Sequence, residues 1–262
     1  MKKKPAFVLA FLLLLASLSA LAMLLPFDRV RYAALFDGIL RAVVLAVLLW
    51  LFFPDLLAFA KERGSAGPLW ILPCVLVALA NFPLSALLCG TAVVTLPEKI
   101  PLLFLQCLLI GCTEEVAFRG VIHRMAVRKL SGKPYGYLRA LLFSSGLFGA
   151  FHLLNIFEAS PAAVCLQAGY TFLLGCMFAV CYDRTRRLSV CCILHAAFDF
   201  GGHLISDLGE GDPHDTFFAV ITAVCAVACG LHILASLFAA EAFDARRTRG
   251  CGGDDAPDSA RS

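Results

Sequence analysis

The chain has 262 residues, of which 60% are hydrophobic and 16% are charged, and its net charge is +3. A soluble core of this size cannot bury so much apolar surface, so the composition excludes a soluble globular protein and predicts a polytopic membrane protein. The basic residues form short clusters between apolar runs, which is typical of loops between membrane spans and excludes a nucleic-acid-binding surface.

The first apolar run, 6–25, follows three lysines and is 20 residues long. Small residues at positions 20 and 22 resemble a signal-peptide cleavage site, but the length of the run favours an uncleaved transmembrane helix. Together with the later runs it predicts an all-α membrane protein of about eight transmembrane helices. The seven further spans are predicted at 39–60, 69–96, 101–123, 140–157, 162–182, 188–205 and 216–243.

The distribution of the 22 lysines and arginines predicts the orientation of these helices. With a cytoplasmic N-terminus, most of them face the cytoplasm, as the positive-inside rule requires. Only Arg29, Arg31, Arg41 and Lys99 are left for the outer side or for helix ends, with Arg119 set aside as part of a motif. We therefore expect a multi-pass protein of the cell membrane with both termini in the cytoplasm. Residues 1–245 are predicted to form one domain, and 246–262, where the apolar pattern ends, a disordered cytoplasmic tail.

Two adjacent carboxylates, Glu114 and Glu115, lie at the end of the apolar run that begins at Pro101. On a helix, Glu115 and Arg119 are four residues apart with the acid first, which is the favourable order for an ion pair. Glu114 points about 100° away and is not the partner of that arginine. Charges inside a membrane are energetically costly, so these residues indicate a functional site.

Two later helices also carry polar groups: His152 follows Phe148 by four residues, and Asp199 follows His195 by four. A carboxylate beside a histidine fixes its tautomer and tunes its basicity. At a helical rise of about 1.5 Å per residue, Glu114, His152 and His195 all lie roughly 12 to 15 Å from the cytoplasmic ends of their helices. The sequence therefore predicts one intramembrane polar site, formed in the core region 101–199.

The chain also contains 12 cysteines. They lie mostly within apolar segments, without a Cys-x-x-Cys motif or a ligand-like spacing to histidine. We expect them to be small apolar core residues.

In order and spacing, the three motifs Glu114-Glu115-x-x-x-Arg119, Phe148-x-x-x-His152 and His195-x-x-x-Asp199 resemble the signature of the CAAX prenyl protease and bacteriocin-processing (CPBP) family of intramembrane proteases. At the position of Asp199 the eukaryotic prenyl proteases usually carry Asn, whereas Asp is common elsewhere in the family. The resemblance therefore does not by itself imply a prenylated substrate.

The resemblance implies that Glu114 is a general base that activates a water molecule. In one scheme His152 and His195 hold the substrate carbonyl and stabilise the oxyanion, Asp199 orients His195, Arg119 locks Glu115, and Phe148 supports the site. In the other, Glu114, His152 and His195 bind a divalent metal ion, most suitably zinc. Asp199 is then either a further ligand or a residue that contacts one of the ligands. Both schemes remain open at this point.

The favoured function is that of an endopeptidase that cuts a membrane-associated peptide or protein in the lipid bilayer, near the cytoplasmic face. A non-catalytic binding or immunity protein on the same fold is the alternative, although it has no need for a costly polar centre. A proton-coupled transporter is disfavoured, because the sequence shows no internal repeat or matched pair of broken helices.

Overall fold

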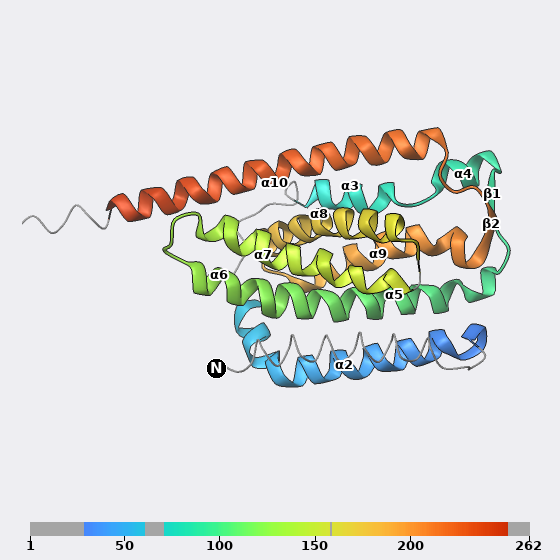
Figure 1. The fold of residues 1–262 in the computed structure, drawn as a ribbon, viewed down its shortest axis with the longest axis horizontal. Helices are drawn as coiled ribbons and strands as arrows, with labels where there is room; N and C mark the ends of the chain where they lie inside the picture. Colours follow the sequence, from blue (N-terminus) through green and yellow to red (C-terminus); the bar gives the residue numbers. More distant parts are fainter. Residues whose placement is uncertain (1–28, 61–70, 158, 251–262) are drawn as a thin grey trace, which may run out of the picture.

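The structure is a computed structural model, and it describes residues 29–60, 71–157 and 159–250. This part of the chain is almost entirely helical, and its long helices lie along one axis (Figure 1). The predicted span 6–25 and the last part of the predicted tail, 251–262, lie outside the described residues. The elements are α2 (Arg29–Ala60), α3 (Leu72–Ala80), α4 (Leu84–Cys89), β1 (Ala92–Val94), η2 (Pro97–Lys99), α5 (Ile100–Glu115), η3 (Val116–His123), α6 (Arg124–Leu130), α7 (Gly136–Phe151), η4 (His152–Phe157), α8 (Pro161–Thr185), α9 (Leu188–Leu208), β2 (Gly209–Gly211) and α10 (Thr216–Gly250).

Five helical stretches of the described chain are long and apolar enough to cross a membrane, which confirms the predicted all-α polytopic class. They are Pro97–Leu130, Gly136–Phe157, Pro161–Thr185, Leu188–Leu208 and Thr216–Ala239. A shorter apolar stretch, Gly38–Pro54, lies within α2. The helix α10 continues to Gly250, and so it includes the first residues of the predicted disordered tail. Residues 245–249 are mostly Ala and Arg, which are good helix formers and favour this extension.

The predicted span 69–96 does not form one helix. After α3 the chain breaks at Asn81, and the short helix α4 begins at Leu84. Pro83 lacks the N–H that would continue the hydrogen bonds of α3, and it disfavours helical backbone at the preceding residue. Gly90 then ends α4 in a left-handed conformation with φ of 73°. The sequence predicted one continuous span here, and this is wrong, so the count of about eight spans is not confirmed.

A two-stranded antiparallel sheet, which the sequence pattern did not predict, lies at one end of the helices (Figure 1). Ala92 of β1 is opposite Gly211 of β2, and Val94 is opposite Gly209. Gly211 has φ of 101°, and a Cβ there would collide with the carbonyl oxygen of Thr91. The sheet connects the chain after α4 to the end of α9.

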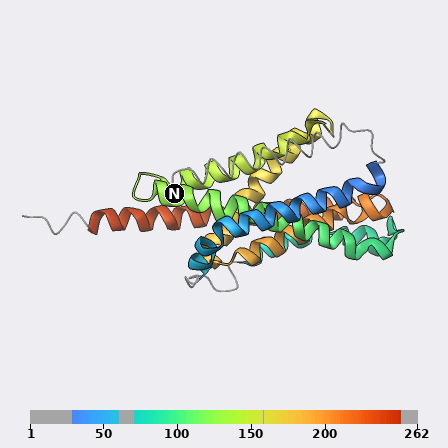
Figure 2. The ribbon, with the colours of Figure 1, turned by 90° about the horizontal axis from the view of Figure 1, so that it is seen from below.

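The closest helix pairs are α5 with α9 and α7 with α8. The helix α2 lies along α5 and η3, and α10 covers α3 (Figures 1 and 2). The three elements α5, η3 and α6 follow one another without a break and form one long helix, the motif helix. This helix contacts α2, α7 and α9. This central position places the predicted motif residues inside the bundle.

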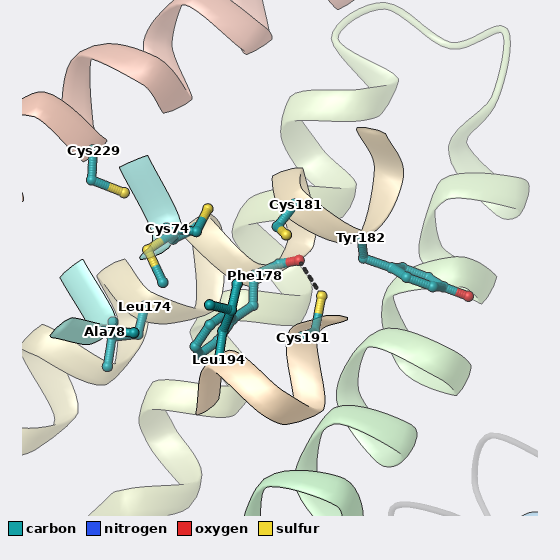
Figure 3. Close-up of a cluster of buried hydrophobic side chains, with 10 residues drawn as sticks. Cys74, Ala78, Leu174, Phe178, Cys181, Tyr182, Cys191, Leu194 and Cys229 are labelled. Atoms are coloured by element: carbon teal, nitrogen blue, oxygen red, sulfur yellow. Dashed lines mark hydrogen bonds between the residues drawn. The ribbon is translucent and has the colours of Figure 1, made fainter. Parts of the chain in front are cut away.

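One apolar core between α3, α8, α9 and α10 is rich in sulfur (Figure 3). It contains Cys74, Cys181, Cys191 and Cys229, all of them buried free thiols. The Cys191 thiol donates a hydrogen bond to the carbonyl oxygen of Phe178 at 3.5 Å. These cysteines are core residues, as their apolar sequence context predicted.

Candidate active site

The motif helix changes its geometry directly after the two carboxylates. The 8 residues of η3, Val116–His123, form a π-helix, and all of them are buried. Short π-helical segments within α-helices occur frequently at functional sites. Between the end of α5 and this segment the predicted ion pair is present, because Nη1 of Arg119 lies 3.0 Å from Oε1 of Glu115. The two side chains are 2% and 0% exposed.

The guanidinium of Arg119 is surrounded by groups that stabilise its charge. Its Nη2 donates to the carbonyl oxygen of Gly175 at 3.3 Å. Its Cζ lies 4.2 Å from the ring centroid of Phe148 and 5.5 Å from that of Phe178. A cation over an aromatic face gains most where water is excluded. Phe148 was predicted to support the site, whereas Phe178 and Gly175 carry no signal in the sequence, because both lie in the uniformly apolar run of α8.

His195, on α9, connects the two carboxylates. Its Nδ1 donates to Oε1 of Glu115 at 2.9 Å, and its Nε2 lies 3.8 Å from Oε2 of Glu114. Asp199 also lies on the Nε2 side, at 3.5 Å. The ring stacks on Phe178, with centroids 5.3 Å apart and an interplanar angle of 22°. Glu115 therefore holds the imidazole at Nδ1, and Asp199, which was expected to orient the ring, lies on its Nε2 side.

A glycine allows the close approach of α5 and α9 at this point. A Cβ on Gly111 would lie 3.0 Å from both the carbonyl oxygen of Cys192 and the backbone nitrogen of Ala196. Small residues at a helix interface let two backbones come close together within a membrane. Gly111 is one helical turn before the carboxylates, so this contact brings Glu114 and Glu115 to the level of His195.

Glu114 is also buried, at 7% exposure, but its surroundings differ from those of Glu115. Its Oε1 lies 3.5 Å from Nη1 of Arg41, which is on α2. Its Oε2 is buried and has no hydrogen-bond partner among the described residues. Arg41 was expected on the outer side or at a helix end, and the structure instead places it beside the site. No motif in the sequence connects it to Glu114.

His152 is the first residue after α7. Its Nδ1 donates to the carbonyl oxygen of Phe148 at 2.9 Å, and its ring contacts the Phe148 ring edge to face with centroids 5.1 Å apart. The Phe148 ring is also 5.9 Å from that of His195, so Phe148 lies near both imidazoles. His152 interacts electrostatically with Glu114 and Asp199. The structure thus brings all four residues predicted to be catalytic into one region.

The donor groups of the site are of the types that bind zinc. Both histidines use Nδ1 for a bond to a protein acceptor and keep Nε2 for another partner, as metal-binding histidines do. Oε2 of Glu114, which has no hydrogen-bond partner in the described part of the chain, adds a carboxylate, and this combination suits zinc. In their present spacing, however, no three His, Cys, Asp or Glu side chains of the described chain are grouped closely enough to hold an ion.

The fold and the site together define an α-helical membrane protein with a buried carboxylate and histidine centre. Residues 96–201 match the family model described as type II CAAX prenyl endopeptidase Rce1-like. This segment contains the three motifs, and the match supports the CPBP family that they indicated. Neither the curated proteins nor the solved structures include a significant match to the chain. Arg41 and the whole of α2 lie outside the matched segment.

Proposed function

We propose that the protein is an intramembrane endopeptidase that hydrolyses a membrane-associated peptide or protein near the cytoplasmic face, with Glu114 as the base that activates water. One observation carries the proposal. Oε2 of Glu114 lies 3.8 Å from Nε2 of His195, and it is buried with no hydrogen-bond partner among the described residues, as is Oε2 of Glu115. Burying a carboxylate oxygen without a hydrogen-bond partner costs free energy, and such a group inside a membrane indicates a functional site.

In this mechanism the Oε2 atom of Glu114 takes a proton from a water molecule, and the water oxygen attacks the carbonyl carbon of the scissile peptide bond. When the C–N bond breaks, Glu114 returns that proton to the leaving amine. The Nδ1–H of His195 is held by Glu115, so the ring can present only Nε2 to the substrate. A proton on Nε2, beside Asp199 and Glu114, is placed to be donated to the developing oxyanion.

The ring of His152 is also fixed by a hydrogen bond from its Nδ1. Its Nδ1–H is committed to the Phe148 carbonyl, so Nε2 is the atom that faces a ligand. In the metal-dependent version of the proposal, Nε2 of His152 and of His195 and a carboxylate oxygen of Glu114 would hold zinc. The ion would polarise the substrate carbonyl and acidify the water. Asp199, on the Nε2 side of His195, would then lie beside the ligands, and Glu115 would hold the ring through Nδ1.

The deciding experiment compares membrane peptides from cells that express the wild type or Glu114→Gln. The amide removes the base, and the cation that it leaves opposite, Arg41, is 22% exposed and so partly solvated. We therefore expect normal abundance and thermal midpoint. Cleavage should fall by roughly a hundredfold or more, which is the low end of what a general base contributes. Unchanged peptides in the two samples would contradict the proposal and favour the binding-protein alternative. Repeating the assay with the purified wild type and 1,10-phenanthroline tests the metal, since only the metal-dependent version predicts a loss that zinc restores.

A further inference from the structure

Arg41 contacts the motif helix through both its side chain and its backbone. Its Nη1 lies 3.5 Å from Oε1 of Glu114, and its carbonyl oxygen lies 3.4 Å from the hydroxyl of Thr113. The Arg41 side chain is 22% exposed, so water screens the pair only in part. An arginine within an apolar helix normally faces the bundle interior and pairs with another group, and it marks a functional position.

The packing of α2 fixes where this arginine points. Val44, Leu48 and Phe52 are buried in one core with Val116 and other residues of η3. Residues 41, 44, 48 and 52 recur at the three-to-four-residue spacing of one helix face. Arg41 therefore continues the buried face of α2, and the docking of that face against the motif helix brings the guanidinium to Glu114.

The two oxygens of Glu114 consequently have different surroundings. Arg41 lies at Oε1, whereas Oε2 has no hydrogen-bond partner among the described residues and is the oxygen nearer His195. We infer that Arg41 is a positioning residue of the active site, which holds Oε1 of Glu114 so that Oε2 is presented to the attacking water. This inference rests on the proposed function, and it extends the site to α2, which lies outside the segment that matches the family.

The test measures kcat and KM for the full-length protein with Arg41→Met and Arg41→Lys. The substrate is a fluorogenic peptide carrying the cleavage site found by comparing wild-type and Glu114→Gln membranes. Misplacing a reacting group by about 1 Å can lower a rate by roughly a hundredfold. For Arg41→Met we therefore expect kcat to fall by about tenfold or more with KM changed by less than about twofold. Arg41→Lys, which restores the charge, should return kcat to within about threefold of the wild type.

Arg128→Met is the matched control, because Arg128 is an exposed arginine on α6, and it should keep both constants. If Arg41→Met fails to accumulate, Arg41→Gln replaces it with the same expectations. If Arg41→Met, or Arg41→Gln in its place, keeps the wild-type kcat while Glu114→Gln is inactive, this inference alone is overturned. It is also overturned if the kcat of Arg41→Lys is no higher than that of the neutral variant. The absence of any cleavage that depends on Glu114 would overturn the proposed function, and this inference with it.

Discussion

At the scale of single residues, two adjacent and chemically identical side chains have different partners. Glu115 is fully buried, and its Oε1 is shared by Arg119 and His195 at 3.0 and 2.9 Å. Glu114 has Oε1 near Arg41 and Oε2 near Nε2 of His195, and Oε2 of both carboxylates lacks a hydrogen-bond partner in the described chain. We propose that these different partners let Glu115 hold the site together and leave Glu114 for the chemistry.

Replacing Glu115 should damage the fold as well as activity. Glu115→Ala leaves the buried guanidinium of Arg119 without its carboxylate, and breaking a buried pair in this way typically costs about 3 to 5 kcal/mol. We expect low membrane abundance and a clearly reduced thermal-aggregation midpoint, with Glu114→Gln as the matched control that keeps both. A stably folded, inactive Glu115→Gln together with an active Glu114→Gln would show that the two roles are reversed.

The residues of the site could be predicted only where their partner is close in sequence. The spacing of four residues identified Glu115 with Arg119 and His195 with Asp199, and both pairs are present in the structure. Arg41 acts across a gap of more than 70 residues, so no local pattern relates it to the carboxylates. Phe178 is one more aromatic residue in an apolar helix, and its stacking on His195 depends on how α8 and α9 pack.

At the scale of elements, the helices of the site depend on close backbone contact between α5 and α9. A methyl group on Gly111 would meet two backbone atoms of α9 at 3.0 Å. Gly146, on α7, has open space around the same position and is the matched control. Because alanine favours a helix over glycine by up to about 1 kcal/mol, a harmless substitution should stabilise the protein.

We therefore expect Gly146→Ala to keep or raise the thermal midpoint and to keep activity. Gly111→Ala should lower the midpoint and reduce cleavage, and Gly111→Leu should do both more strongly, because α5 and α9 are forced apart. Thermal midpoints and cleavage rates of the three variants make the comparison. Equal behaviour of Gly111→Ala and Gly146→Ala would show that the helix contact has no part in forming the site.

Hydropathy predicts where an apolar helix lies, but it does not predict how the helix is interrupted. The runs that became α5, α7, α8, α9 and α10 were recognised because each is long and apolar. The run 69–96 has a similar composition, and its break depends on backbone hydrogen bonds around Asn81 and Pro83. The π-helical turns of η3 could not be predicted from composition either, because they differ from an α-helix only in hydrogen-bond register.

At the scale of the whole molecule, the basic and the acidic connections between helices lie at opposite ends of the bundle. The basic connection between α6 and α7 lies at the same end as the last turns of α10, and the sheet lies at the other (Figure 1). The loop after β2 contains Asp212 and Asp215 and no lysine or arginine. We propose that the basic end faces the cytoplasm, because basic loops remain on that side.

Labelling of introduced cysteines tests this orientation. Asp212→Cys should react with an impermeant thiol reagent in intact cells, and Lys133→Cys should react only after the membrane is opened. Both positions are exposed, and the wild type gives the background from its own thiols. The opposite pattern, with Lys133→Cys labelled first, would reverse the proposed orientation.

The position of His195 within α9 has a consequence for the substrate itself. His195 lies two turns after the first residue of α9, which is about 10 Å along the helix axis. An extended peptide advances about 3.3 Å per residue, so a chain that enters from the basic end must thread roughly three residues past the start of α9. A stable helix rises only about 1.5 Å per residue and hides its carbonyl groups in hydrogen bonds. We therefore expect the cleaved segment to be one that unwinds easily near the membrane surface, with glycine, proline or small polar residues beside the scissile bond.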